Sequence, residues 1–169
     1  MEKKINEAVS EIQLSWKRLT GESIEKIKST LKALARDQEV QKQLQIETRM
    51  LSKGMELYRD QSNGFLVLAY SEDQGNYRTP HDHGHAWVVY VVASGEVEMG
   101  NYFKFVRPSG QTELVLKSRE RLTAGDERIY YPGEIHDTRC ASENALILRL
   151  SSHDLREEEK AGRMNRYKI

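Results

Sequence analysis

The chain has 169 residues, enough to bury one good core, so we expect a single domain with at most a small appendage. Its 26 basic and 26 acidic residues cancel, which argues against nucleic acid or an anionic membrane as the main partner, because both favour a basic face. No apolar run approaches the ~20 residues that span a bilayer, and the first residues lack the continuous apolar stretch of a signal peptide. The lone Cys140 excludes an internal disulfide. We therefore expect a cytoplasmic protein.

Apolar residues recur at helical spacing over residues 1–50. A first stripe is formed by Ile5, Ala8, Val9, Ile12 and Trp16. The sequence LTGES then interrupts the pattern, and Thr20 or Ser23 can cap a second helix. A shorter third helix is expected after Asp37. This helical segment is predicted to pack on the domain that follows it.

The pattern changes to short β-branched and aromatic runs within residues 51–155. Turn sequences such as SNG, PSG, AGD and PGE separate these runs. Short strands at this spacing predict an antiparallel sandwich or barrel. The charged segment 156–169 is expected to be a solvated tail. The predicted strands cover residues 64–70, 86–93, 96–106, 112–118, 127–132 and 144–151.

Three histidines at two-residue spacing, His81, His83 and His85, precede one of these strands. In a regular strand they share one face. The rise of ~3.3 Å per residue would separate His81 from His85 by ~13 Å. Because a metal–imidazole bond is only ~2.1 Å long, only an adjacent pair can bind one ion. Gly84 could permit a bulge, so the pairs His81/His83 and His83/His85 both stay open.

A pair of histidines needs a partner from elsewhere in the chain. His136, in YYPGEIHDTRC, follows a Pro-Gly turn that leads into a short strand, and His153, in LSSHDL, is the other candidate. Asp82 and Asp137 each flank a candidate ligand. By strand alternation both carboxylates should point away from a metal, and we expect them to be solvated.

The stretch GNYRTPHDHGHAWVVYVVASG resembles the first motif of the cupin family, G-x5-H-x-H-x3,4-E-x6-G. Gly75, His81, His83 and Gly95 fall at the motif positions, and this match selects His81/His83 as the pair. Val88 occupies the position of the motif's glutamate. His85 is expected to point inward farther along the strand.

The second cupin motif, G-x5-P-x-G-x2-H-x3-N, is matched more loosely by Gly125, Pro132, Gly133 and His136, with Cys140 in place of the asparagine. The resemblance covers residues 75–140. It implies a mainly β fold, the cupin double-stranded β-helix or jelly-roll barrel, preceded by the N-terminal helices. It also implies a metal held by His81, His83 and His136.

A cupin site with three histidines and no glutamate resembles that of the thiol dioxygenases, of which cysteine dioxygenase is the best-known type. The resemblance implies iron(II), Fe²⁺, as the cofactor. It also implies a small thiol carboxylate and dioxygen as substrates, with both oxygen atoms added to the sulfur to give a sulfinate. Three imidazoles also suit other divalent ions such as Zn, Cu, Ni or Mn.

The same resemblance assigns substrate-binding residues. In LYRDQSNGFLVLAY, Arg59 follows Tyr58 at the place where the family's arginine pairs with the substrate carboxylate. Arg149 shares a strand face with Ser151 and is an alternative anchor for that carboxylate. Trp87 is expected to line the pocket, as are Tyr58, Tyr90 and Tyr130.

The SSHDL stretch resembles the family's Ser-x-His-x-Tyr relay beside the iron. Ser151 and His153 match its first two members, and Leu155 replaces the tyrosine. The family's cysteine–tyrosine crosslink has neither partner here, which puts cysteine in doubt as the substrate. Two further hypotheses are therefore kept: a cupin metalloenzyme that catalyses C–C cleavage, isomerisation or a lyase reaction, and a non-catalytic cupin that binds a metabolite. The family is also compatible with a homodimer.

Overall fold

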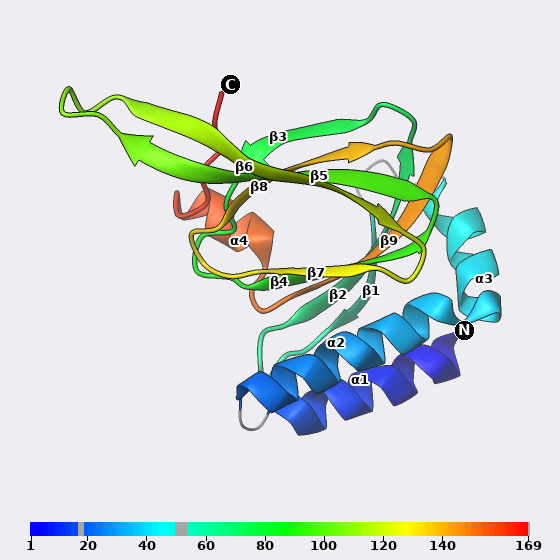
Figure 1. Ribbon diagram of the computed structural model, residues 1–169. Helices are drawn as coiled ribbons and strands as arrows, with labels where there is room; N and C mark the ends of the chain where they lie inside the picture. Colours follow the sequence, from blue (N-terminus) through cyan, green and yellow to red (C-terminus); the bar gives the residue numbers. More distant parts are fainter. Residues whose placement is uncertain (17–18, 50–53, 169) are drawn as a thin grey trace.

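The computed structural model describes residues 1–16, 19–49 and 54–168, and its secondary structure is three helices followed by a β barrel and a short fourth helix (Figure 1). The helices are α1 (Glu2–Trp16), α2 (Gly21–Arg36), α3 (Gln38–Thr48) and α4 (Leu155–Lys160). The strands are β1 (Met55–Arg59), β2 (Leu66–Asp73), β3 (Tyr77–His81), β4 (Val88–Ser94), β5 (Glu96–Val106), β6 (Thr112–Thr123), β7 (Glu127–Tyr130), β8 (Ile135–Cys140) and β9 (Asn144–Ser151).

Side chains cap the N-termini of α2 and α3 as their sequences predict. The Thr20 hydroxyl accepts a hydrogen bond from the Ser23 amide at 3.2 Å, and the Ser23 hydroxyl accepts one from the Thr20 amide at 2.7 Å. Asp37 accepts from the Val40 amide at 3.0 Å. These contacts satisfy amides that have no partner inside the helix, so each helix begins where its cap lies. No helix among the described residues is long and apolar enough to cross a membrane.

The barrel is built from two antiparallel sheets with the strand orders β1-β2-β9-β4-β7 and β3-β8-β5-β6. Strand β2 pairs with β9, β3 with β8, β4 with β7 and β5 with β6. These nested pairs are those of one long hairpin folded into two facing sheets, which is the jelly-roll arrangement. The expected double-stranded β-helix is confirmed.

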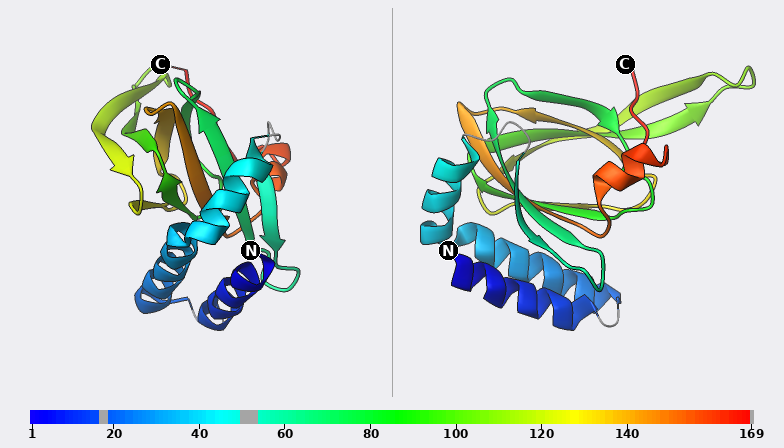
Figure 2. Two further views of the ribbon diagram at one scale, coloured as in Figure 1. Left: turned by 90° about the vertical axis from the view of Figure 1, so that its right-hand side faces the viewer. Right: turned by 180° about the vertical axis from the view of Figure 1, so that it is seen from behind.

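The helices cover the outer face of the five-stranded sheet (Figure 2). Strand β4 is therefore buried on both faces and reads as a continuous apolar run. Val89 and Val91 pack in the core shared with the helices, whereas Val88, Tyr90 and Val92 pack between the two sheets. The position of a residue along β4 thus decides whether it faces the helices or the barrel interior.

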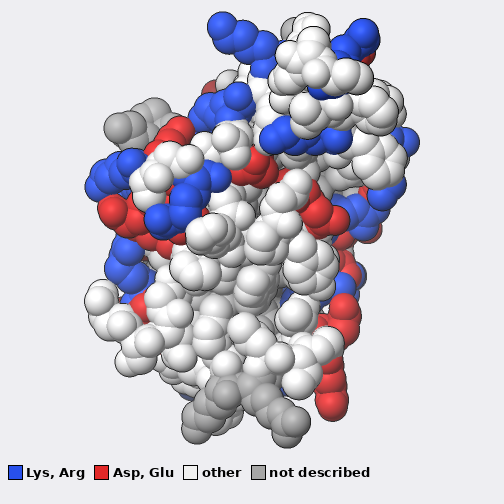
Figure 3. Space-filling view, turned by 90° about the vertical axis from the view of Figure 1, so that its left-hand side faces the viewer, with Lys and Arg blue, Asp and Glu red and all other residues white. Residues whose placement is uncertain are grey.

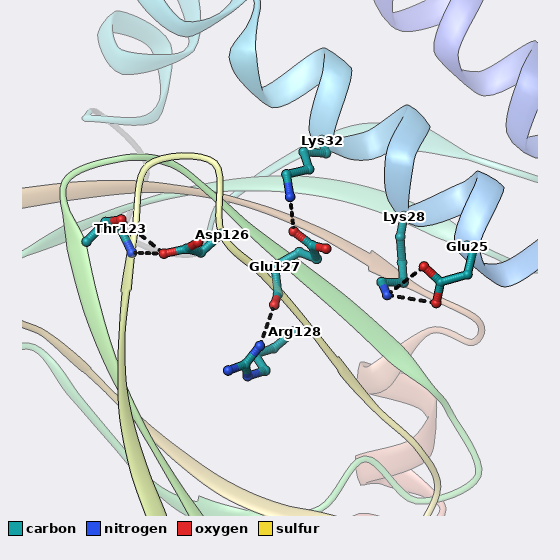
Figure 4. A network of polar contacts seen from close by, with 7 residues as sticks. All are labelled: Glu25, Lys28, Lys32, Thr123, Asp126, Glu127 and Arg128. Atoms are coloured by element: carbon teal, nitrogen blue, oxygen red, sulfur yellow. Dashed lines mark hydrogen bonds and ion pairs between the residues drawn. The ribbon is translucent and has the colours of Figure 1, made fainter.

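Polar contacts fasten α2 to the edge of the barrel (Figure 4). Lys32 of α2 forms an ion pair with Glu127, at the start of β7. In the turn before β7, Asp126 accepts hydrogen bonds from the amide and the hydroxyl of Thr123 at 2.8 and 3.0 Å. These hydrogen bonds within the turn hold the backbone next to Glu127, so the carboxylate that pairs with Lys32 is held in position.

Phe65 is the residue whose truncation should most damage the core between helices and sheet. Its side chain is 0% exposed, and its ring centroid lies 4.6 Å from that of Trp16 and 5.8 Å from that of Tyr58. We expect Phe65→Ala to lower the free energy of unfolding by about 3–5 kcal/mol in urea titrations, because it leaves a large cavity. Phe105→Ala is the control: Phe105 is 62% exposed, and its loss should change the free energy of unfolding by less than about 0.5 kcal/mol. Equal losses in the two variants would contradict this view of the core.

The β5–β6 hairpin projects beyond the barrel on the side where α4 lies (Figure 1). Figure 3 looks onto this side of the molecule. Its upper half carries charged side chains of both signs close together, and its lower half is mostly uncharged.

Candidate metal centre

Three buried histidines converge at one end of the four-stranded sheet. His81 ends β3, His136 lies near the start of β8, and the two are directly paired across the strands. His83 follows two residues after β3. Each of the three offers a ligand atom, and these atoms all lie within 4.8 Å of one another. The structure therefore brings together the three histidines that the sequence selected.

The local backbone differs from the expected regular strand. Strand β3 ends at His81, and Gly84, with φ of +61°, forms a turn that redirects the chain before β4 begins. His83 reaches the cluster from this loop, not from a strand face. His85 lies past the turn and is exposed, and its amide donates to Glu158 Oε2 at 3.0 Å. The expectation that His85 points inward is wrong, because strand alternation stops at His81.

The spacing of the imidazole nitrogens fits a shared metal ion. His83 Nε2 and His136 Nε2 lie 3.3 Å apart. Two donors that each lie ~2.1 Å from one ion, at bond angles between octahedral and tetrahedral values, are separated by roughly 3.0–3.4 Å. His81 Nδ1 lies 2.8 Å from the Thr79 carbonyl oxygen, to which it can donate, so its Nε2 is left for a metal.

Burial keeps the three imidazoles in the form that binds metals. It lowers the pKa of His83 to about 3 and lowers the pKa of His81 and of His136 below the ordinary value of 6.5. The rings are therefore neutral near pH 7, and a neutral ring has a lone pair to give. No carboxylate or thiolate belongs to this group among the described residues. The three histidines fit a divalent ion, to which each offers one imidazole nitrogen.

A cavity of about 430 Å³ opens beside the cluster, with His81 in its wall. Sites for small molecules commonly have this size. Apolar side chains such as Leu68, Met99 and Ile147 line part of it. Its polar wall contains Tyr70, Glu72, Arg78, Tyr90 and Arg149.

Arg149 lines this cavity, and its charge acts on all three histidines. Its guanidinium lies 5.0 Å from the centroid of the Tyr70 ring, and its Nε is buried and has no hydrogen-bond partner among the described residues. Its positive charge contributes to the lowered pKa of His81, His83 and His136. A buried donor without a partner is costly, so this guanidinium is suited to a bound anion.

Arg59 also lines the cavity, but its charge is already paired. It forms ion pairs of 2.8 Å with both Glu56 and Asp154, and these carboxylates raise its pKa. A guanidinium held by two carboxylates has little capacity left for a substrate. Of the two arginines that the sequence proposed as anchors, Arg149 is the better placed.

Tyr58 and Trp87 lie on the helix-facing side of the five-stranded sheet and do not reach the cavity. Trp87 stacks on Trp16 with ring centroids 5.1 Å apart. The Tyr58 hydroxyl accepts from Gln13 Nε2 at 3.0 Å, and both rings pack against the helix core. Because the helices make both faces of this sheet apolar, no alternation along the sequence distinguishes the helix-facing side from the cavity side. The prediction that Tyr58 and Trp87 line the pocket is therefore wrong, and both residues contact the helices instead.

The expected relay between Ser151 and His153 is not formed. Ser151 ends β9 and is buried, and its hydroxyl has no partner among the described residues. His153 lies beyond the strand and is exposed, with its Nδ1 3.0 Å from the hydroxyl of Ser152. Alternation along β9 does not extend past Ser151, so His153 turns away from the cluster.

The charged C-terminal segment docks on the histidine loop, contrary to the expected solvated tail. Asp82 is buried and accepts hydrogen bonds from the Gly84 amide, the Asn165 amide and side chain, and the Tyr167 hydroxyl, all at 2.9–3.1 Å. Arg166 forms a β-bridge with His81 and lines the cavity. Sequence reasoning missed these contacts, since no periodicity links Asp82 to residues more than eighty positions away.

Asp137 points away from the histidines, as alternation predicts, but it is not solvated. It is fully buried and accepts from the hydroxyls of Tyr77 and Tyr102 and from the Gly100 amide, at 2.6–3.0 Å. Arg119 completes this set at 3.1 Å. The network fixes the outer face of β8 directly behind His136, so it positions that ring indirectly.

No protein-family model matches the sequence, and no curated protein matches it. Solved structures with a similar backbone include KdgF from Halomonas sp., with a TM-score of 0.46 and 17% identity, covering 58% of this chain and 74% of that one. The Cnp3 cupin domain of Schizosaccharomyces pombe gives a TM-score of 0.48 and 11% identity over 65% of this chain and 66% of that one. Peruvianin-I, a cysteine peptidase from Thevetia peruviana latex, gives a TM-score of 0.42 and 22% identity over 53% of this chain. The match spans about half of the length of peruvianin-I, 51%.

Glu158 connects α4 to the histidine loop and should make stability depend on pH. It is 3% exposed, and Arg163 donates to both of its oxygens, at 3.0 and 2.7 Å, which lowers its pKa from 4.5 to about 2. Since the folded pKa lies below the unfolded one, ionised Glu158 stabilises the fold above about pH 4.5, and this contribution is lost as the pH falls towards about 2.

We expect Glu158→Gln to lower the free energy of unfolding at pH 7 by about 1–3 kcal/mol, with a difference from the unmodified protein that shrinks below about pH 4. Urea titrations at a series of pH values measure this. Glu157→Gln is the control, because Glu157 is exposed. A Glu158→Gln effect that stays constant from pH 7 to about pH 2.5 would contradict the assigned pKa.

Proposed function

We propose that the chain is a mononuclear metal-dependent oxidoreductase of the thiol dioxygenase type, which adds dioxygen to the sulfur of a small thiol carboxylate. The observation that carries the proposal is the set of three buried, neutral imidazoles beside a cavity lined by Arg149. In the part of the chain that the structure describes, no carboxylate joins this set and the Arg149 Nε has no hydrogen-bond partner. Iron(II) is the proposed ion, and zinc, nickel and manganese are the alternatives that imidazole ligands also accept.

In this proposal His81, His83 and His136 hold the ion. When bound, iron(II) would lower the pKa of a substrate thiol and provide the site for dioxygen. The protein's own contribution is mainly positioning. Arg149 would bind the substrate carboxylate in the cavity, and the apolar wall of Leu68, Met99 and Ile147 would exclude water around the substrate.

Oxygen consumption tests the proposal. Anaerobic protein loaded with iron(II) would be mixed with oxygenated buffer and a panel of small thiols: cysteine, thiol carboxylates without its amino group, and thiols without a carboxylate. We expect oxygen uptake with a matching amount of sulfinate for at least one thiol carboxylate, and far less for its uncharged analogue. If no thiol is oxidised by iron-loaded protein, the proposed reaction is wrong.

A second candidate is a cupin metalloenzyme with other chemistry, namely C–C bond cleavage, isomerisation or a lyase reaction. It is favoured by the exposed His153 and by Leu155, which leave the proposed site without the relay that the thiol dioxygenase resemblance implies. Turnover of a diketone or a sugar acid by protein that leaves every thiol unchanged would support this candidate. Binding of such a ligand without any turnover would support a non-catalytic role.

A further inference from the structure

The hydroxyl oxygen of Tyr90 lies beside the histidine cluster, and neither cupin motif includes this residue. It lies on β4, two residues after Val88, so both side chains point into the barrel. Its hydroxyl oxygen is 3.3 Å from His83 Nε2, and its ring centroid is 5.4 Å from that of His136. The side chain is buried. Val88 offers no ligand atom, so Tyr90 is the next inward residue of β4 that carries one.

The Tyr90 oxygen has the spacing of a metal ligand. Its distance from His83 Nε2 equals the 3.3 Å that separates His83 Nε2 from His136 Nε2. Both distances fall within the roughly 3.0–3.4 Å expected for two donors on one ion. Each of the two pairs that share His83 Nε2 therefore has the spacing of two neighbouring donors on one ion.

Burial raises the pKa of Tyr90, and the positive charge of Arg149 acts in the opposite direction. Arg149 lies directly opposite Tyr90 in the β4–β9 pairing, so the two side chains are cross-strand neighbours. Arg78 also lines the cavity, where its guanidinium is paired with Glu72. The glutamate of the first cupin motif would supply one negative charge, and Val88 occupies its position here. A phenolate from Tyr90 would restore that charge from the same strand.

We infer that Tyr90 is the fourth protein ligand of the metal that His81, His83 and His136 are proposed to hold. The inference rests on the proposed metal centre and deepens it. On binding, the phenol O–H bond breaks, the proton passes to solvent, and an oxygen lone pair forms the bond to the metal. The ligand set becomes three imidazoles and one phenolate, and an octahedral ion keeps two positions for substrate and dioxygen.

Tyr130 offers a matched control for this inference. Its ring stacks on His136 with centroids 3.9 Å apart and an angle of 22° between the planes. It is as buried as Tyr90, but its hydroxyl donates to Asn101 Oδ1 at 3.0 Å and so is engaged away from the histidine nitrogens. Removing the Tyr130 hydroxyl therefore removes a buried phenol beside the same ring without removing the proposed ligand.

The test uses iron as an optical probe. Full-length protein, Tyr90→Phe and Tyr130→Phe would be loaded with iron(II) without oxygen and then oxidised to iron(III) with one equivalent of ferricyanide. Visible absorption and resonance Raman spectra would be recorded, and bound iron would be measured on the same samples. We expect a phenolate-to-iron(III) charge-transfer band in the unmodified protein and in Tyr130→Phe. In Tyr90→Phe we expect its loss, together with iron affinity weaker by about 10–100-fold.

Each outcome of this test supports or overturns Tyr90 as a ligand. Bound iron without the band in the unmodified protein, or a band that survives in Tyr90→Phe, would overturn the ligand assignment and leave the three-histidine centre intact. Failure of the unmodified protein to bind iron would overturn the centre as well. If Tyr90→Phe does not fold, unmodified protein containing ring-deuterated tyrosine replaces it: phenolate vibrations that shift with the label, and that persist in Tyr130→Phe, support Tyr90, whereas their absence overturns it.

Discussion

The His136→Ala variant is expected to purify with less than about a tenth of the metal bound by the unmodified protein. His136 Nε2 lies 3.3 Å from His83 Nε2, and the ring is completely buried. Alanine removes one of the three imidazole ligands, and the two that remain bind the ion more weakly. Metal per chain, measured by elemental analysis of protein purified without added metal, gives the result. His81→Ala and His83→Ala should behave in the same way.

His85→Ala provides the matched control, because it removes a histidine from the same motif. His85 is exposed and lies past the Gly84 turn, so its loss should leave metal content unchanged. Circular dichroism would confirm that each variant is folded. Loss of metal in His85→Ala, or its full retention in folded His136→Ala, would show that the ion is held elsewhere.

Arg149→Leu is expected to lower kcat/KM for thiol carboxylates by about 100-fold. A charge-assisted, bidentate pair between a guanidinium and a carboxylate contributes roughly 3 kcal/mol in a site that excludes water, which corresponds to a factor of that size. The side chain lines the cavity, its Nε has no partner within residues 1–16, 19–49 and 54–168, and its charge acts on all three histidines. Oxygen uptake with the most active thiol carboxylate measures the effect, and a thiol without a carboxylate should be affected much less.

Arg59→Gln separates this effect from a general loss of positive charge in the cavity. Arg59 is paired with Glu56 and Asp154, so its replacement should change kcat/KM by less than about 3-fold, although it is expected to weaken the contact between β1 and the start of α4. If Arg59→Gln abolishes turnover and Arg149→Leu does not, the carboxylate anchor has been assigned to the wrong arginine.

The sequence predicted the barrel well where strands carry an apolar alternation. The predicted strands at 96–106 and 144–151 match β5 and β9 residue for residue. Strands β1, β3 and β8 were not among the predicted apolar runs, although a short strand was expected around His136. Strand β3 carries Arg78 and His81 at positions where a hydrophobic pattern would need apolar residues, because these two side chains line the cavity. The polar residues of the site thus interrupt the apolar alternation by which a strand is predicted.

The candidate site was predictable only where the motif is local in sequence. His81, His83 and His136 lie in two short stretches with recognisable turn residues. The positions of Trp87, Tyr58 and His153 depend on which side of a sheet the helices cover and on where a strand ends, and a single sequence specifies neither. Tyr90 was expected only as a pocket residue, because its proximity to His83 depends on the Gly84 turn.

Anomalous X-ray scattering from a crystal of metal-loaded protein, collected on both sides of the iron absorption edge, tests the central claim most directly. We expect one strong peak per chain, about 2.1 Å from His83 Nε2 and His136 Nε2 and at bonding distance from a nitrogen of His81. A peak at another place, or no peak in protein that contains iron by elemental analysis, would contradict the three-histidine centre on which the proposed chemistry depends.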